Sequence, residues 1–225
     1  MPIQPYFPEP LTVTGNVAEA KHRDRVRFVR RVVAGHSLTV LTVITCAAIV
    51  PLMLPARLSF VLFLGGLVAL TFERRAFLGG LKDNLLSIAF LLPTLFSLSQ
   101  FLRSLHAAGW PVLTLVPAVI GLALYALFCG NDFSYFGQLL LCGVLTIVSS
   151  LFMGVMGVVP PSQVLFGTFV AFCYIGYYVY DLSMIVKRRK MGEEIAAVAD
   201  LYRDLINFVT YSVRVYFHWR KFRFI

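Results

Sequence analysis

The sequence predicts an all-α membrane protein, a bundle of seven transmembrane helices in which the seventh helix is polar and central. Apolar residues make up 59% of the 225 residues and charged residues only 14%, whereas about a quarter of the residues of soluble domains are charged. Six apolar runs approach the ~20 residues that a helix needs to cross a ~30 Å hydrocarbon core. A seventh run has the length of a span but carries charged side chains.

The six apolar runs, taken in chain order, are expected to cross the membrane. The chain then divides into a basic cytosolic N-terminal tail (1–31), the membrane domain (32–217) and a short basic C-terminal tail (218–225). The expected spans lie near 35–54, 58–72, 85–102, 110–130, 133–159 and 161–186.

Individual residues mark the expected helix ends. Proline bends a helix when it lies inside it and marks a helix start when it lies in the first turn. We expect Pro93, Pro111 and Pro117 to do one or the other. His36 lies next to the expected start of the first span, and we expect it at the membrane interface.

Residues 195–217, IAAVADLYRDLINFVTYSVRVYF, form the polar seventh segment. Polar residues in a spanning helix face the bundle interior or a water-filled cavity, so we expect this helix at the centre, surrounded by the other six. The alternative is the solvated face of a surface helix, which the apolar residues on the remaining faces disfavour. One face carries a polar stripe at helical spacing, made of Asp200, Asp204, Asn207, Tyr211 and Arg214.

The uneven distribution of basic residues over the loops predicts the orientation. Cytosolic loops of membrane proteins carry an excess of Lys and Arg. With the N-terminus in the cytosol, the N-terminal tail, the 73–84 loop and the 187–194 loop hold 6, 3 and 4 Lys/Arg, and the opposite loops hold only Arg57 and Arg103. The net charge of +9 then reflects topology, and we expect no nucleic-acid partner.

An acidic residue in the sixth span suggests an ion site. Asp181 lies in an apolar and aromatic run, six residues before Lys187, where a carboxylate costs about 2.5–3.5 kcal/mol. Six residues correspond to ~9 Å of depth, which Asp204 of the antiparallel seventh helix can match. Two carboxylates in a low dielectric cannot both ionise cheaply, so we expect the pair to share a proton. The same oxygens suit Ca²⁺ as a permeant or transiently bound ion, and no resident cofactor is expected.

The run YYVYDLSMI around Asp181 and the run DLYRDLINFV around Asp204 resemble the two signature motifs of the transmembrane Bax inhibitor motif family, also called the Bax inhibitor/lifeguard family. The resemblance implies seven helices with the seventh at the centre, and a calcium leak across the endoplasmic reticulum or a related membrane. It implies that Asp181 and Asp204 are a proton-sensitive pair at a cytosolic gate. It also implies an arginine at the cytosolic end of the second helix that pairs with Asp181 in the closed state; Arg74 is the first match and Arg75 the second.

Two residues depart from the family pattern. Asp200 and Arg203 stand where smaller or apolar residues are expected. We expect them to pair with each other at i,i+3 and to change the charge balance beside the gate. The short tails and divergent middle favour a diverged member, and a viral copy, for example from a herpesvirus, is the hypothesis for its origin.

The function that this resemblance implies is a pH-sensitive calcium-permeable channel or leak that lowers store calcium and restrains apoptosis, without enzymatic activity. We expect it in the endoplasmic reticulum or Golgi membrane, with the plasma membrane as the alternative. The expected partners are the lipid bilayer, calcium and membrane proteins of cell-death or calcium-release pathways. One alternative function is a non-conducting scaffold that modulates partner proteins. A remote one is an intramembrane aspartyl protease, which the lack of a Gly-x-Gly-Asp motif at Asp204 disfavours.

Overall fold

The structure, a computed structural model, describes residues 13–76, 80–130 and 133–205, without the side chains of 74–76 and 80–83. All regular elements in these ranges are helical. They are η1 (Val17–Glu19), α1 (His22–Ile49), α2 (Ala56–Ala76), α3 (Gly80–Ala107), η2 (Val112–Leu115), α4 (Val116–Phe128), α5 (Tyr135–Val155) and α6 (Pro161–Arg188), followed by a helical segment at 194–205.

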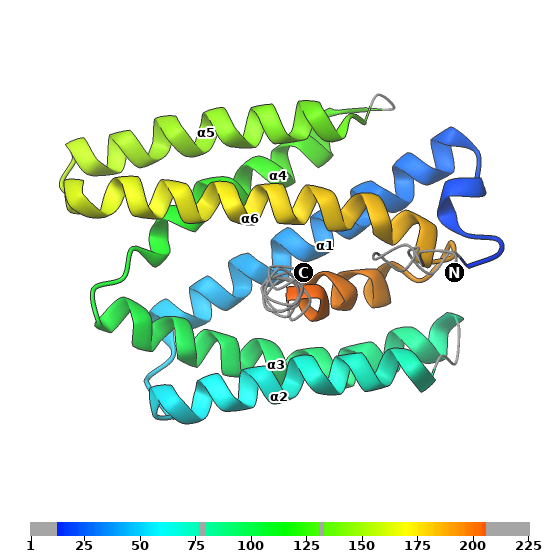
Figure 1. Ribbon diagram of the computed structural model, residues 1–225, viewed down its shortest axis with the longest axis horizontal. Coiled ribbons are helices and arrows are strands. Elements are labelled where there is room, and N and C mark those ends of the chain that lie inside the picture. The colour runs from blue at the N-terminus through cyan, green and yellow to red at the C-terminus, as the bar shows by residue number, and fades with distance from the viewer. Residues whose placement is uncertain (1–12, 77–79, 131–132, 206–225) are drawn as a thin grey trace, which may run out of the picture.

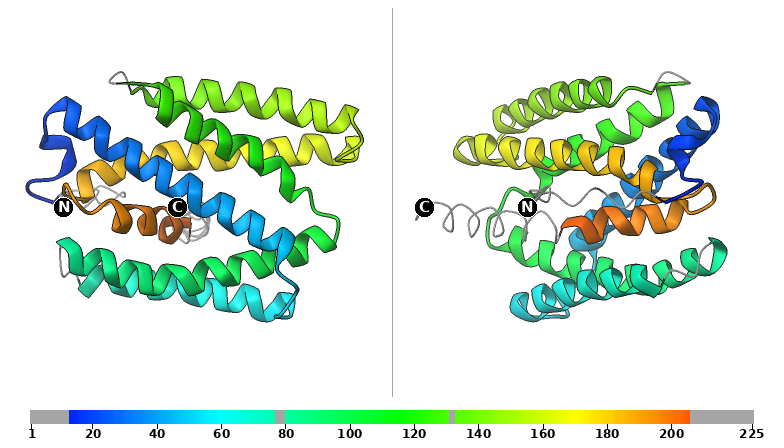
Figure 2. Two further views of the ribbon diagram at one scale, coloured as in Figure 1. Left: turned by 180° about the vertical axis from the view of Figure 1, so that it is seen from behind. Right: turned by 45° about the vertical axis from the view of Figure 1, so that its right-hand side comes forward.

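The helices pack around segment 194–205. The pair formed by α2 and α3 lies on one side and α5, α6 and α4 lie on the other, while α1 crosses the molecule and contacts both α3 and α4 (Figure 1). Segment 194–205 lies between α6 and the α2–α3 pair in each view (Figure 2). Its residues 196–204 are all buried. The described part of the expected polar helix therefore has the central position that its charged residues predict.

Five of the described helices are long and apolar enough to cross a membrane, which makes the chain a multi-pass membrane protein. The expected span at 110–130 is divided: Pro111 caps the short η2, and Pro117 lies in the first turn of α4. The 13 residues of α4 measure about 20 Å, so this helix is shorter than the others. Since the end of the expected seventh helix lies outside the described residues, the count of seven spans stays a prediction.

The first helix begins earlier than expected, at His22 instead of near residue 35. The expected boundary between tail and membrane domain, at 31/32, therefore falls inside α1. The reason is amphipathicity: Phe28, Val29 and Val32 are buried while Arg27 and Arg31 on the other face are exposed. Averaging hydropathy along the chain cannot detect such a one-sided helix, because the charges cancel the apolar residues.

Two half-buried arginines bind the ends of neighbouring helices. Arg30 of α1 donates to the Ala126, Leu127 and Gly130 carbonyls at the end of α4. Arg103 of α3 donates to the Ala47 and Ala48 carbonyls near the end of α1. The last carbonyls of a helix lack partners inside the helix and carry its negative dipole end. Both arginines therefore neutralise helix termini and tie neighbouring helices together.

The helix ends that flank the connections expected in the cytosol lie at one end of the molecule. The start of α1, the ends of α2, α4 and α6, and the starts of α3 and α5 are all toward the right in Figure 1. The start of α2 and the end of α3, which carry Arg57 and Arg103, are at the opposite end. The fold thus separates the basic residues as the orientation requires, and the compartment that each end faces stays a prediction.

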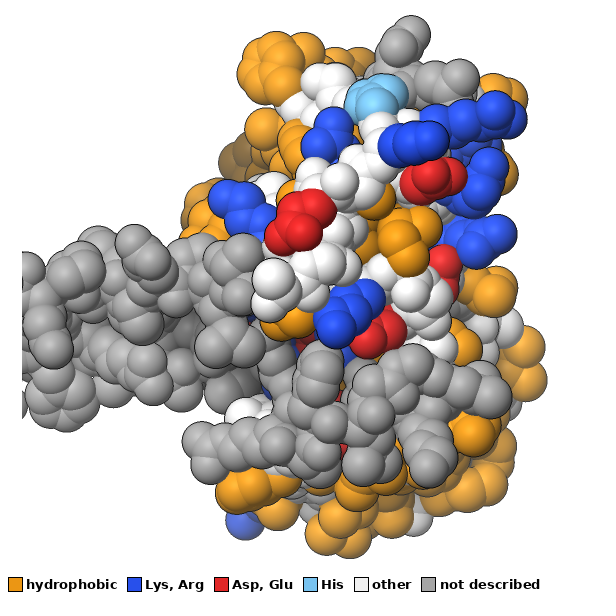
Figure 3. Space-filling view, turned by 90° about the vertical axis from the view of Figure 1, so that its right-hand side faces the viewer, with side chains coloured by type: hydrophobic (Ala, Val, Ile, Leu, Met, Phe, Trp, Pro, Cys, Tyr) orange, Lys and Arg blue, Asp and Glu red, His pale blue; other side chains and the backbone are white. Residues whose placement is uncertain are grey.

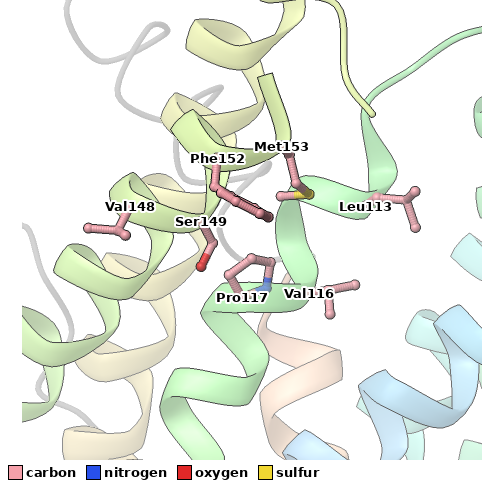
Figure 4. Close-up of a pocket in the computed structure, with 7 residues that line it drawn as sticks. All are labelled: Leu113, Val116, Pro117, Val148, Ser149, Phe152 and Met153. Atoms are coloured by element: carbon pink, nitrogen blue, oxygen red, sulfur yellow. The ribbon is translucent and has the colours of Figure 1, made fainter. Parts of the chain in front are cut away.

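The sides of the molecule are apolar. Phe128, Val155 and Leu165 are each at least 80% exposed, and soluble proteins rarely expose such surfaces. An open crevice of about 420 Å³ lies between α4 and α5, where Ser149 and Phe152 turn toward Pro117 (Figure 4). Its lining is apolar apart from Ser149, and we interpret it as lipid-facing surface.

Two adjacent glycines test the packing of α2 against α3. A Cβ added at Gly66 would lie 2.2 Å from Thr94 Oγ1, whereas one added at Gly65 meets nothing within 4 Å. We expect Gly66→Ala to lower the free energy of unfolding in detergent by about 1–3 kcal/mol through overpacking. Gly65→Ala is the matched control, and we expect it to be neutral or to stabilise by roughly 0.5–1 kcal/mol. Equal effects of the two substitutions would contradict the close approach.

Candidate ion-gating site

The site is built on the hairpin formed by α6 and segment 194–205. The turn between them contains Gly192 with φ +93°, a conformation that favours glycine. Asn84 of α3 holds this turn: its Nδ2 donates to the Gly192 carbonyl at 2.8 Å, and its Oδ1 accepts from the Ala196 backbone N–H at 3.2 Å. The N-terminal segment adds two backbone bonds, from Val13 and Val17 to the end of α6. The hairpin is thus held on two sides by other parts of the chain.

Asp181 faces the interior because it lies on the buried face of α6. Ala171, Ile175, Tyr178 and Ile185 occupy the same face at steps of three or four residues, and Asp181 is 3% exposed. Burial of the apolar residues places this face of α6 in the interior of the bundle. Asp181 is buried with them because it lies on the same face.

The structure brings Asp181 and Asp204 together. Asp204 is 2% exposed, and its carboxylate faces the same guanidinium group as that of Asp181. Arg188 lies between them: its Nη1 donates to Asp204 Oδ2 at 2.8 Å and is 3.7 Å from Asp181 Oδ1. Within the described residues, Asp181 Oδ2 has no hydrogen-bond partner. Arg188 therefore acts as a clamp that joins the last turn of α6 to segment 194–205.

A second arginine, Arg203 of segment 194–205, also neutralises Asp204. Arg203 Nε and Nη2 donate to Asp204 Oδ1 at 2.9 and 2.7 Å, and Arg203 also donates to Asp200. The i,i+3 pairing of Asp200 with Arg203 is thus present. Through Arg203, the aspartate pair is connected to Asp200 and its own ion pair with Arg189.

Arg189 forms this further pair. It is 1% exposed, and its Nε and Nη2 donate to the two oxygens of Asp200 at 2.7 and 2.9 Å. Its Nη1 lies 3.8 Å from Glu193 Oε2. Buried charges are tolerated where partners and extra hydrogen bonds replace water. Three arginines and four carboxylates therefore form one buried network: Arg188, Arg189, Arg203, Asp181, Glu193, Asp200 and Asp204.

The aspartate pair supplies oxygen atoms of the kind that calcium prefers, but only part of a ligand set. Ca²⁺ takes six to eight oxygen ligands, and the oxygens of Asp181 and Asp204 already face the guanidinium groups of Arg188 and Arg203. Within the described residues, no group of three or more His, Cys, Asp or Glu side chains is placed to hold a metal ion. Transient binding of calcium after a cation leaves therefore stays a prediction.

The other predicted site residues have different outcomes. Asn207, Tyr211 and Arg214 lie outside the described residues. Arg74 and Arg75 lie near the end of α2, but their side chains are not described, so their pairing with Asp181 stays a prediction.

Arg188 is not among the residues predicted for the site, although a signal was available. It was expected in the 187–194 loop, whereas α6 continues to Arg188. A residue seven positions after Asp181 is two turns further on the same face, so extending the helix by two residues would have placed Arg188 beside the carboxylate.

His36 also lies elsewhere than expected. It is 3% exposed inside the bundle and not at the interface, because α1 begins earlier. Its Nε2 is 2.9 Å from the Tyr174 hydroxyl, and its ring stacks on Tyr178 at a centroid distance of 4.9 Å. Thr39 and Tyr202 add a second hydroxyl contact at 2.7 Å. These contacts join α1 to the face of α6 that carries Asp181, and to Tyr202 of segment 194–205.

Comparison with known proteins decides the family. Residues 25–216 match the family model described as "Inhibitor of apoptosis-promoting Bax1", which covers most of the chain. The chain belongs to the Bax inhibitor family. This result confirms the resemblance carried by the runs around Asp181 and Asp204.

Curated relatives of this Bax inhibitor family member include Arabidopsis thaliana proteins. The BI1-like protein is 30% identical over 104 residues, which is 46% of this chain and 41% of the relative. Protein LIFEGUARD 3 is 33% identical over 104 residues (43% and 41%), and Protein LIFEGUARD 1 is 31% identical over 126 residues (54% and 52%). The chain thus spans about half the length of these relatives or less. No solved structure matches it, and the viral origin stays a hypothesis.

Substitutions at two acidic residues of segment 194–205 compare the stability contribution of a buried ion pair with that of a more exposed one. We expect Asp200→Asn to destabilise the protein by about 3–5 kcal/mol, because it leaves buried guanidinium charge without its carboxylate. Glu194→Gln is the matched control: Glu194 pairs at 3.1 Å with Arg31, whose side chain is 63% exposed, and such pairs contribute at most about 1 kcal/mol. Unfolding in detergent measures both. A cost for Asp200→Asn no larger than that of the control would contradict the buried network.

Proposed function

We propose that this protein is a pH-sensitive calcium-permeable channel or leak of intracellular membranes, with a gate at Asp181 and Asp204. The observation that carries the proposal is the pair of buried carboxylates from α6 and segment 194–205 with Arg188 between them. Acidic side chains inside a membrane bundle mark ion and proton pathways.

Three cations compete for the same oxygens in this proposal. Arg188 occupies them in the closed state, a proton neutralises them at low pH, and calcium uses them during passage. A protonated pair attracts calcium less strongly, because Coulomb attraction depends on the carboxylate charge. Acidification is therefore expected to lower the flux, and separation of Arg188 from Asp204 is expected to raise it.

The cellular role follows from the family. The family description names inhibition of apoptosis-promoting Bax1, and we propose that this chain restrains apoptosis by lowering the calcium content of a store. We place it in the endoplasmic reticulum or Golgi membrane with the basic end of the bundle in the cytosol, since basic residues favour that side. Membrane proteins of cell-death or calcium-release pathways are the proposed protein partners, and no enzymatic activity is proposed.

Removing either carboxylate charge tests the gate. In liposomes loaded with a calcium dye, we expect wild-type protein to conduct less as the pH falls. Asp181→Asn and Asp204→Asn remove the titrating group, so each is expected to give a low flux with a flattened pH response. The readout is the initial rate of calcium entry at several pH values, at equal amounts of folded protein.

Two outcomes of this experiment would count against the mechanism. Unchanged, pH-responsive flux in both variants would show that the aspartate pair does not control passage. Absence of flux in the wild type, with cell survival unaffected by the two substitutions, would favour the non-conducting scaffold.

The clamp is tested by Arg188→Gln. Hydrogen bonds to charged groups contribute about 1.5–3 kcal/mol, so loss of this one is expected to increase the open fraction, and the calcium flux at neutral pH, by about tenfold or more. Lys190→Gln is the control, because it removes the same charge from the same turn, while the Lys190 side chain is exposed and forms none of the ion pairs of the network. An equal effect of both variants would assign the change to surface charge.

A further inference from the structure

We propose that a pocket at the basic end of the bundle binds the phosphate headgroup of an anionic membrane lipid. The pocket has a volume of about 360 Å³ and lies where the start of α1, the start of α5 and the end of α6 meet. Three basic side chains line it, His22, Arg25 and Lys187, together with the hydroxyl-bearing Tyr135 and Ser183. Nothing in the gating mechanism uses these residues.

The charge of the lining favours an anion. No acidic side chain is among the lining residues, so the basic groups face a space without a carboxylate. Hydroxyl groups and basic side chains together are the usual donors to phosphate oxygens. The gathering of Lys and Arg at this end of the molecule is visible in Figure 3.

Arg25 gives the strongest argument. It is half-buried, and its guanidinium group contacts His22 Nδ1 at 3.1 Å, its one side-chain hydrogen bond within the described residues. The other buried or half-buried arginines of the described side chains have acceptors: carboxylates for Arg188, Arg189 and Arg203, and helix-end carbonyls for Arg30 and Arg103. Arg25 is thus the one such arginine, within that part of the chain, that lacks an anionic or carbonyl partner. Partial burial of a guanidinium group favours a ligand that supplies one.

The position and the lining of the pocket favour a lipid over a soluble anion. The lining also contains apolar side chains, among them Val29, Phe133 and Val186, which suit the glycerol and first acyl carbons of a lipid. The pocket lies at the end expected in the cytosol, and the cytosolic leaflet is the one that carries anionic lipids. Basic pockets between helices on that side are known as headgroup sites.

This lipid pocket is separate from the gate. Ser183, Val186 and Lys187 lie on one face of α6, and Asp181 and Arg188 lie on the opposite face, as helical spacing requires. The inference therefore goes beyond the proposed function, and lipid binding can be measured without any calcium flux.

The experiment titrates fluorescent phosphatidic acid into the full chain reconstituted in phosphatidylcholine nanodiscs. We expect saturable binding, weakened about tenfold or more by the double substitution Arg25→Gln/Lys187→Gln, since this variant loses charged donors to the phosphate oxygens. The matched control is Arg23→Gln/Lys190→Gln, which removes the same charge from exposed residues at the same end that do not line the pocket. We expect its binding to stay close to that of the wild type.

Further arms make the result decisive. Equal weakening by both double variants would overturn the pocket in favour of diffuse surface attraction, and so would absence of saturation. Competition by soluble glycerol phosphate at the same concentration as the lipid would assign the pocket to a soluble anion and overturn the lipid assignment. If Arg25→Gln/Lys187→Gln does not fold, Tyr135→Phe/Ser183→Ala removes only hydroxyl donors. Weaker binding in that variant supports the proposal, and unchanged binding overturns it.

Discussion

The clamp formed by Arg188, Asp181 and Asp204 is the interaction on which the rest of the site depends. It joins the end of α6 to segment 194–205 through charges that are almost fully buried. Such charges are stable only if each has partners in place before water is excluded. The hydrogen bonds of Asn84 and of the N-terminal segment to the same hairpin meet this need, because they fix the turn that sets the arginine positions.

The network also explains why a highly charged segment can occupy the centre of a membrane bundle. Segment 194–205 brings Asp200, Arg203 and Asp204 into the interior, and Arg188 and Arg189 from the end of α6 add positive charge to them. Asp200 and Arg203, the two expected departures from the family pattern, form an ion pair with each other, so each side chain compensates the buried charge of the other. Among the described side chains, the cations beside the aspartate pair come from the hairpin itself, so the charge balance of this pair depends on the local geometry of the hairpin.

The sequence predicted those parts of the fold and site that depend on local pattern. The burial of Asp181, its approach to Asp204 and the central position of segment 194–205 follow from apolar runs and helical spacing. Arg188 and His36 could not be placed correctly by the same means, because both depend on where a helix ends or begins. Those ends are set by tertiary contacts: α1 extends to His22 because one face packs inside the bundle, and α6 extends to Arg188 because its arginine finds buried carboxylates.

The basic residues at the end of α6 then have two separate tasks, determined by the face of the helix on which they lie. Arg188 points inward and neutralises carboxylates. Lys187 lines the pocket that we propose for a lipid phosphate. A rule that counts loop charges treats both residues as topology signals. The structure distinguishes them by burial and by partner: side-chain exposure is 17% for Arg188, while Lys187 is exposed. The role of a basic residue in a short membrane loop therefore depends on where the preceding helix ends. When the buried face of that helix continues into the loop, a basic residue on this face points into the bundle.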